Sequence, residues 1–202
     1  MDRCSEDMDF RQYRFLVYSD LYRIVERPGT RDFLRTLLQE PGFRYCFLLR
    51  TCRYLRSRPL LKYTLYPIAR FLHSHYTFKY GISISPATSI GSGFYIAHFG
   101  GIVVNTDAII GKNCNLNHVV TIAQTNRGER KGVPVIGDNV YIGPGAKIIG
   151  KVKVGNNAAI GANCVVTKDV PENAVVVGVP GKVISYKGSA GYVNRTDYET
   201  DS

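Results

Sequence analysis

The sequence predicts a parallel β-helix preceded by an α-helical region. From Ile84 onward aliphatic residues recur at every sixth position, the period of hexapeptide β-helix repeats. Apolar residues before Gly81 follow helical spacing instead. The chain has 202 residues, of which 45% are hydrophobic and 21% charged, so it can fill one core. We therefore expect helices in residues 1–80, the β-helix in 81–186 with a projecting loop at 123–135, and a flexible tail at 187–202.

Proline and glycine divide the helical region. The first helix is expected to stop at Pro28-Gly29, because these residues end a run of apolar positions at helical spacing. Thr30 is expected to cap the second helix, and Pro67 to kink the fourth. The expected spans of the second, third and fourth helices are Thr30–Leu38, Phe43–Arg56 and Leu60–Phe78.

The net charge of +10 is concentrated in the helical region. Residues 1–80 hold 15 Lys and Arg against 8 Asp and Glu, whereas residues 81–202 hold 11 against 8. An excess of Lys and Arg in one half of a chain is typical of proteins that bind polyanions, but it also occurs on solvent-exposed helical surfaces. The basic and aromatic stripe of the last two helices fits either a membrane-surface patch or ordinary packing with a basic outer face. We favour packing, and expect neither membrane contact nor a nucleic-acid partner.

The termini and cysteines favour a cytoplasmic protein. No apolar run approaches the roughly 20 residues of a membrane-spanning helix. The segment Met1–Asp7 is too acidic and polar for a secretory signal. The cysteines are odd in number and form no CxxC pair, which argues against a disulfide framework or a zinc ribbon: Cys4, Cys46, Cys52, Cys114 and Cys164.

The hexapeptide register has two interruptions. Its aliphatic positions are Ile84, Ile90, Ile96, Ile102, Ile110, Leu116, Ile122, Ile136, Ile142, Ile148, Val154, Ile160 and Val166. The step from Ile102 to Ile110 is eight, which predicts a two-residue insertion. The step from Ile122 to Ile136 is fourteen, which predicts the loop in Ala123–Val135. Small residues four positions further on are expected to fill the space beside the aliphatic side chains: Thr88, Thr106, Cys114, Ala146, Ala158 and Cys164.

The period also predicts a column of residues along one corner of the prism. Three hexapeptides make one coil, so Ile96, Leu116, Ile142 and Ile160 share a face. Two residues beyond them lie His98, His118, Pro144 and Ala162. Imidazoles that titrate near neutral pH are natural general bases, and the two small residues leave room for an extended ligand. The alternatives are two turn histidines without a task, or a metal site. The repeats contain no third histidine, so we expect no metal.

From about Pro41 onward the chain resembles the hexapeptide-repeat acyltransferases, and among them the serine O-acetyltransferases. Gly42-Phe43 followed by Arg50 is similar to the family's final helices, and the segment from Ile84 to Gly91 to its first coil. Further matches are His98–Val104, Ile142–Gly150, Ile160–Ala162, Val166–Pro171 and Gly178–Ile184.

This resemblance implies a left-handed β-helix, a homotrimer with sites between neighbouring subunits, and acetyl-CoA as acetyl donor. It implies that His98 is the general base, with His118 as the reserve. It implies that CoA lies along the corner column, with Lys168 and Lys182 by its nucleotide. The residues expected at CoA are Gly143, Pro144, Gly145, Gly161, Ala162, Thr167, Lys168 and Lys182.

Four positions depart from the family pattern. Ser83 stands where the family has the aspartate that orients the histidine, and Ala97 where it has an acidic residue. Val133 replaces a second histidine, and Arg27-Pro28 aligns with an Asp-Pro. The missing carboxylates are those that would pair with the ammonium group of an amino acid.

Three hypotheses therefore remain open. The first is transfer to L-serine, giving O-acetylserine for cysteine synthesis, with Ser83, Arg127 or Arg130 contacting the acceptor. The second is transfer to a saccharide hydroxyl, which needs no partner for an ammonium group. The third is a non-catalytic trimeric β-helix scaffold, against which the complete CoA end of the chain argues.

Overall fold

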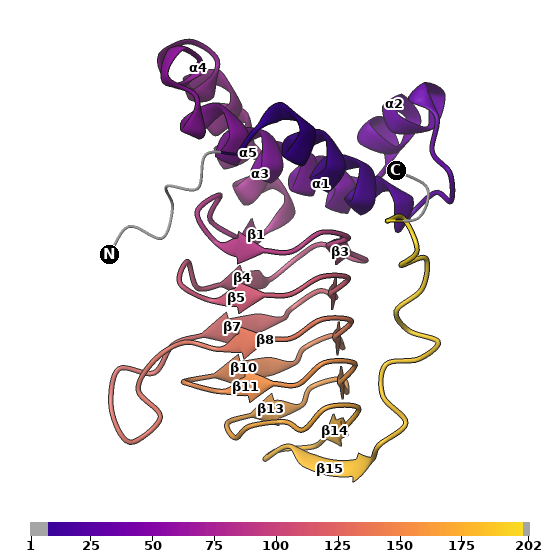
Figure 1. Cartoon of the computed structure of the whole chain (residues 1–202). Coiled ribbons are helices and arrows are strands. Elements are labelled where there is room, and N and C mark those ends of the chain that lie inside the picture. The colour runs from indigo at the N-terminus through magenta and orange to yellow at the C-terminus, as the bar shows by residue number, and fades with distance from the viewer. Residues whose placement is uncertain (1–7, 200–202) are drawn as a thin grey trace.

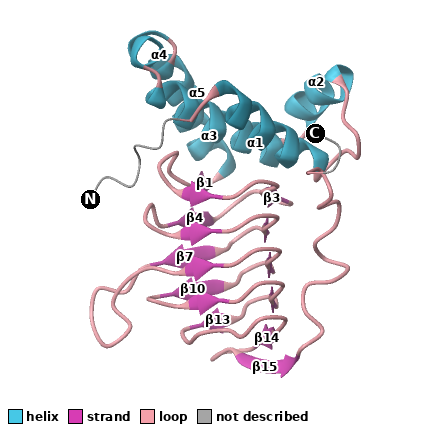
Figure 2. Cartoon of the chain, viewed as in Figure 1, coloured by secondary structure: helices cyan, strands magenta, loops and turns pink. Residues whose placement is uncertain are grey.

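The computed structural model describes residues 8–199. Helices form one end of the molecule and a parallel β-helix forms the rest (Figure 1). The helices are α1 (Phe10–Tyr22), α2 (Thr30–Gln39), α3 (Pro41–Ser57), α4 (Pro59–Thr64) and α5 (Tyr66–Tyr80). Short strands stack below them in three sheets, joined by turns at the corners of the prism (Figure 2).

Each sheet takes one strand from each coil, and neighbouring strands are parallel. Sheet A contains β1 (Ile82–Ser83), β4 (Ile102–Val104), β7 (Thr121–Ala123), β10 (Lys147–Ile149) and β13 (Val165–Val166). Sheet B contains β2 (Ser89–Ile90), β5 (Ile109–Ile110), β8 (Val135–Ile136) and β11 (Lys153–Val154). Sheet C contains β3 (Tyr95–Ile96), β6 (Asn115–Leu116), β9 (Tyr141–Ile142), β12 (Ala159–Ile160), β14 (Val175–Val177) and, antiparallel to β14, β15 (Lys182–Ser185).

The helix boundaries correct two details of the sequence interpretation. Gly29, not Thr30, is the N-cap of α2, and its N–H donates to the Asp32 carboxylate at 2.9 Å. The expected fourth helix is two helices, α4 and α5, joined at Leu65. Pro67 lies in the first turn of α5, where its missing N–H costs nothing, whereas within one continuous helix its ring would collide with the preceding turn.

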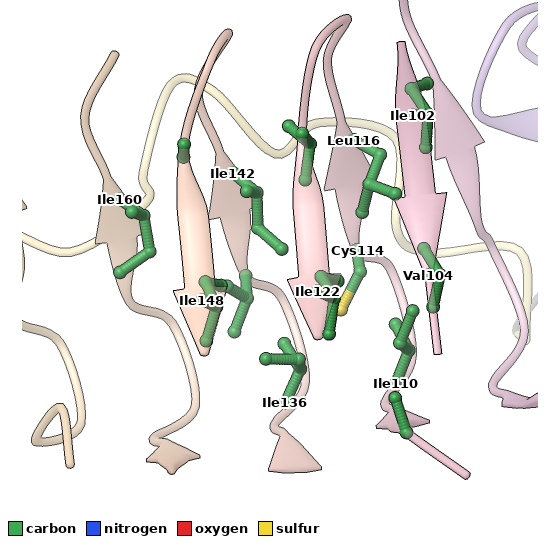
Figure 3. Packing of buried hydrophobic residues seen from close by; sticks show 14 of the residues in the cluster. Ile102, Val104, Ile110, Cys114, Leu116, Ile122, Ile136, Ile142, Ile148 and Ile160 are labelled. Atoms are coloured by element: carbon green, nitrogen blue, oxygen red, sulfur yellow. The ribbon is translucent and has the colours of Figure 1, made fainter. Parts of the chain in front are cut away.

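The interior of the prism is an aliphatic stack (Figure 3). The strand register moves the two-residue insertion from the place that the sequence predicts. Val104, not Ile102, pairs with Ile122, so the extra residues lie between Ile96 and Val104, at the first corner of the expected histidine column. Ile102 is buried as well, and pairs with Ile82 of β1. The step from Val104 to Ile110 is then six.

The insertion also changes which small residue fills the space beside the aliphatic side chain of that coil. Thr106 is exposed, and Ala108, four residues after Val104, is buried in its place. The other expected small residues, such as Cys114 and Ala146, are fully buried. The four cysteines within the described residues are unpaired and buried, which agrees with the absence of a disulfide framework.

The C-terminal segment corrects the prediction of a frayed tail. Residues 187–199 run back along the β-helix toward the helices (Figure 1). The Ser189 hydroxyl donates to the Asn139 carbonyl at 2.6 Å, and the buried Tyr198 hydroxyl donates to Asn113 Oδ1 at 2.8 Å. The prediction is therefore wrong for residues 187–199, while residues 200–202 lie outside the described part.

Candidate active site

The strand register aligns the faces from which the predicted corner column was counted. Along sheet C, Ile96 pairs with Leu116, Leu116 with Ile142, and Ile142 with Ile160. The residues two positions beyond the last three, His118, Pro144 and Ala162, therefore stack at successive corners of the prism. At the first corner Gly100 stacks on His118, and His98 projects from the inserted residues beside it. The His98 and His118 rings face each other edge to face, with centroids 5.9 Å apart. Both imidazoles are exposed, so an acceptor can reach either one.

His98 lies on a wider turn than the residues below it. The segment Ala97–Gly101 holds the two inserted residues, and the stacking resumes where the Val119 N–H donates to the Gly100 carbonyl at 2.7 Å. Gly101 has φ +65°, and a Cβ there would lie 3.3 Å from the Val119 Cα. The inserted turn also reaches the helices, because the Phe99 ring lies 5.3 Å from the Tyr80 ring of α5. The position of His98 therefore depends on both the coil and the helical end.

In the part of the chain that the structure describes, no carboxylate hydrogen-bonds to either imidazole. Within residues 8–199, neither ring has a hydrogen-bond partner. Ser83, at the family's aspartate position, is exposed on β1 and alternates with the buried Ile82 and Ile84, so it points outward from sheet A. Its strand neighbour is Val103 of β4, the strand that follows the His98 turn. Ser83 therefore lies near the histidine corner, but it offers a hydroxyl in place of a charge.

The sequence interpretation missed one cation at this corner. Lys147 of β10 pairs with Thr121 of β7, and its ammonium donates to the carbonyl of Val119, the residue after His118. Lys147 precedes the core residue Ile148, so it belongs to the outward positions of sheet A. The signal in the sequence is its place directly before a core residue of sheet A, since such positions point outward near the histidine corner. Its charge can favour an anionic group of a substrate.

The glycines of the lower coils permit close stacking of the turns. A Cβ on Gly143 would lie 2.8 Å from the Ile160 carbonyl oxygen, and one on Gly145 would lie 2.0 Å from Asn163 Oδ1. A Cβ on Gly161 would lie 2.8 Å from Val177 Cγ1. These contacts give the three glycines a structural role whether or not a ligand binds. With Pro144 half-buried and Ala162 exposed, they leave the corner smooth and accessible.

The other expected CoA residues fall at two different corners. Lys182 begins β15 and pairs with Val177, beside the Gly161 turn, so it lies at the lower end of the column. Thr167 and Lys168 are exposed after β13, at the opposite edge of sheet A. Within one chain the column and Lys182 therefore belong together, and Thr167 and Lys168 do not join them.

The loop arginines also lie away from the histidines. The loop leaves sheet A after Ala123, one strand beyond His118, and returns at β8. Arg130 ion-pairs with Asp169 at 3.0 Å and donates to the Lys151 carbonyl at 3.4 Å, and Arg127 is exposed. Within the described chain, Arg130 is therefore engaged with Asp169 and Lys151, and the structure shows no contact of either arginine with His98.

No group of three or more His, Cys, Asp or Glu side chains in residues 8–199 is placed to hold a metal ion. No helix in the same range is long and apolar enough to cross a membrane.

Comparisons with known proteins agree with this architecture. The family model "Bacterial transferase hexapeptide (six repeats)" matches residues 134–168, so fold and repeat define a hexapeptide-repeat transferase. The serine acetyltransferase of Synechococcus elongatus is 36% identical over 172 residues, which are 84% of this chain and 68% of the relative. The chain belongs to the serine O-acetyltransferase family.

Solved structures give the same family. A Brucella abortus serine acetyltransferase in complex with coenzyme A matches with a TM-score of 0.73 and 30% identity, over 89% of this chain and 70% of that one. Soybean serine acetyltransferase complexed with serine matches with a TM-score of 0.70 and 34% identity, over 85% and 69%. This chain therefore spans about seven tenths of the solved relatives.

Proposed function

We propose that this protein is an acetyl-CoA-dependent O-acetyltransferase of the serine acetyltransferase type, with L-serine as acceptor and O-acetylserine for cysteine synthesis as product. The observation that carries the proposal is the column of two exposed, adjacent histidines followed by two small residues. The relatives solved with coenzyme A and with serine support both substrates. We further infer left-handed coils, a cytoplasmic homotrimer, and no metal in the reaction.

The mechanism that we infer is direct transfer. His98 takes the proton of the acceptor hydroxyl while the oxygen attacks the thioester carbon of acetyl-CoA. The tetrahedral intermediate then collapses, the carbon–sulfur bond breaks, and the imidazolium returns the proton to the departing CoA sulfur. A backbone N–H of the Gly100-Gly101 turn is suited to the oxyanion, because donors fixed in the fold need no reorganisation. His118 is the reserve base, and the centroid of its ring lies 5.9 Å from that of His98.

The substrates would approach along the corner. We place the pantetheine arm over Pro144 and Ala162 and the nucleotide near Lys182, with Thr167 and Lys168 meeting it only from a neighbouring copy. Such a copy would also bring Arg127 and Arg130 to the histidines. Lys147 is available to pair with the carboxylate of serine. Symmetric association is therefore part of the proposal, because one chain does not supply all the expected contacts.

A saccharide acceptor is the second candidate. Ser83 and Ala97 supply no carboxylate for an ammonium group, and neither histidine ring is held by an acid. A sugar hydroxyl needs neither of these contacts. The base and the donor site would be unchanged.

The test is release of free CoA by the purified protein, with L-serine and a panel of sugars as acceptors. We expect saturable release with serine. Replacing His98 with Ala should lower kcat by at least about 10²-fold, the lower range for loss of a general base. His118→Ala should lower it less, and His75→Ala, an exposed histidine on α5, is the matched control. CoA release with a sugar but not with serine would establish the second candidate. An unchanged kcat in His98→Ala would assign the role of general base to His118.

A further inference from the structure

The α4–α5 hairpin exposes an apolar face that residues 8–199 leave uncovered. In α5, Ala69, His73 and Tyr80 are buried, and α5 packs on α3. Ile68, Phe71, Leu72, His75 and Phe78 follow helical spacing on the opposite side, where Phe71 is 72% and Phe78 84% exposed. Helix α5 is therefore apolar on two sides, and only one of them has a partner in the chain.

Helix α4 extends the same feature. Leu60 is 77% exposed and Tyr63 79% exposed, and Leu65 between the two helices is half exposed. We call the exposed apolar residues of this hairpin the outer face: Leu60, Tyr63, Leu65, Ile68, Phe71, Leu72 and Phe78. The sequence interpretation, which favoured packing for this stripe, is wrong for these side chains within the described chain. The hairpin lies at the end of the molecule away from β15 (Figure 1).

The charges within α3, α4 and α5 have one sign. Residues 41–80 contain eight Lys and Arg and no Asp or Glu. Lys62 and Lys79 are exposed beside the apolar residues, and the Lys62 ammonium lies 5.6 Å from the Tyr63 ring centroid. Arg70 is exposed as well, but its guanidinium lies 3.3 Å from Nδ1 of the buried His73, on the packed side of α5. Long cationic side chains beside exposed aromatic and aliphatic groups suit a surface that is anionic outside and apolar beneath.

We propose that the outer face of α4–α5 docks on anionic lipid bilayers. Face-to-face pairing with the same face of a second copy is disfavoured, because it brings cations together without a carboxylate from either hairpin to offset them. Contact with a different surface of another copy is an outcome of the light-scattering test below. Nucleic acid would use the cations but leave Leu60, Phe71 and Phe78 in water. A bilayer accommodates both, since anionic headgroups meet Lys62 and Lys79 while the rings enter the interface. This inference does not depend on the proposed acetyl transfer.

Docking would also orient the candidate active site. Helix α5 ends at Tyr80, whose ring contacts Phe99, the residue after His98. The bilayer would therefore lie at the histidine end of the column, and the Lys182 end would point away from it.

The experiment is co-sedimentation of the full chain with vesicles of phosphatidylcholine alone, or with one third phosphatidylglycerol. We expect binding to the anionic vesicles only, weakening with added salt. Phe71→Ser combined with Phe78→Ser should reduce the partition coefficient at least about tenfold, since two large apolar side chains lose their burial. Lys62→Glu with Lys79→Glu should reduce it about tenfold through charge. Leu34→Ser with Leu38→Ser, two exposed leucines of α2, is the matched control and should bind as the wild type.

Several outcomes would overturn the proposal. One is absence of wild-type binding to phosphatidylglycerol vesicles, and another is equal loss in the α2 control. A third is a changed molar mass of the Phe71/Phe78 variant by light scattering, which would assign the outer face to contacts between copies. Serine-dependent CoA release without vesicles serves as a separate readout. It should be unaffected by these variants, so failure of docking and failure of the proposed activity are distinguishable.

Discussion

Asp20 and Arg50 form a buried ion pair that joins the helices to the first coil. Arg50 Nε lies 3.0 Å from Asp20 Oδ2, and both side chains are 1% exposed. The guanidinium also donates to the carbonyls of Ile90 and Gly91, at 2.8 and 2.6 Å. Asp20 Oδ1 accepts from the Phe94 N–H at 2.8 Å. The pair therefore fixes the chain on both sides of the turn that leads into β3 and, two residues beyond β3, to His98.

Asp20→Asn tests how much this pair contributes. The amide can still accept from the Phe94 N–H, so the change mainly leaves the Arg50 charge buried without its counter-ion. Breaking a buried pair in this way costs about 3–5 kcal/mol of unfolding free energy. That is a large part of the roughly 5–15 kcal/mol typical of a domain. Arg50→Met in the Asp20→Asn background removes the second charge and should restore about 2 kcal/mol, although the Ile90 and Gly91 carbonyls then lose their donor.

The assay is urea unfolding at pH 7 and one fixed protein concentration. Glu199→Gln is the matched control, because Glu199 pairs with Lys112 at 2.7 Å while both side chains are about half exposed. An exposed pair contributes at most about 1 kcal/mol. The reasoning is refuted if Asp20→Asn and Glu199→Gln reduce the unfolding free energy equally, or if the double variant is less stable than Asp20→Asn.

Two further predictions concern the column and pH. Ala162→Phe should raise the KM for acetyl-CoA about tenfold with a smaller effect on kcat, and an unchanged KM would contradict the ligand path along the corner. Burial, with the nearby Arg70 charge, lowers the pKa of His73 from 6.5 to about 4. The unfolded chain therefore binds more protons between these values, and stability is lost as pH falls below about 6.5, by about 2 kcal/mol at pH 5. Urea unfolding at pH 7.5 and pH 5 should show this loss of stability, and His73→Asn should remove it. If the loss persists in His73→Asn but disappears in His75→Asn, then His75, and not His73, is responsible for it.

The sequence predicts the β-helix well because every coil must bury aliphatic side chains at the same positions, which gives the sequence a regular period. Its error in placing the insertion has a simple cause. Ile102 and Val104 are two residues apart on one strand, so both face inward, and periodicity cannot tell which one continues the stack. Only the pairing of Val104 with Ile122 decides it. The packed C-terminal segment was missed because it depends on single contacts such as that of Tyr198, which leave no period in the sequence.

The outward positions of sheet A limit the chemistry of the acceptor. Ser83, Val103, Thr121, Lys147 and Val165 are the residues that precede its core positions, and they include one cation and no acid. A carboxylate of the acceptor thus has a partner within the same chain, whereas an ammonium group has none on this face. If serine is the acceptor, the contact to its ammonium group must come from outside these five positions. A saccharide would not need that contact. The choice between the two acceptors is therefore also a question of how the chains associate around His98.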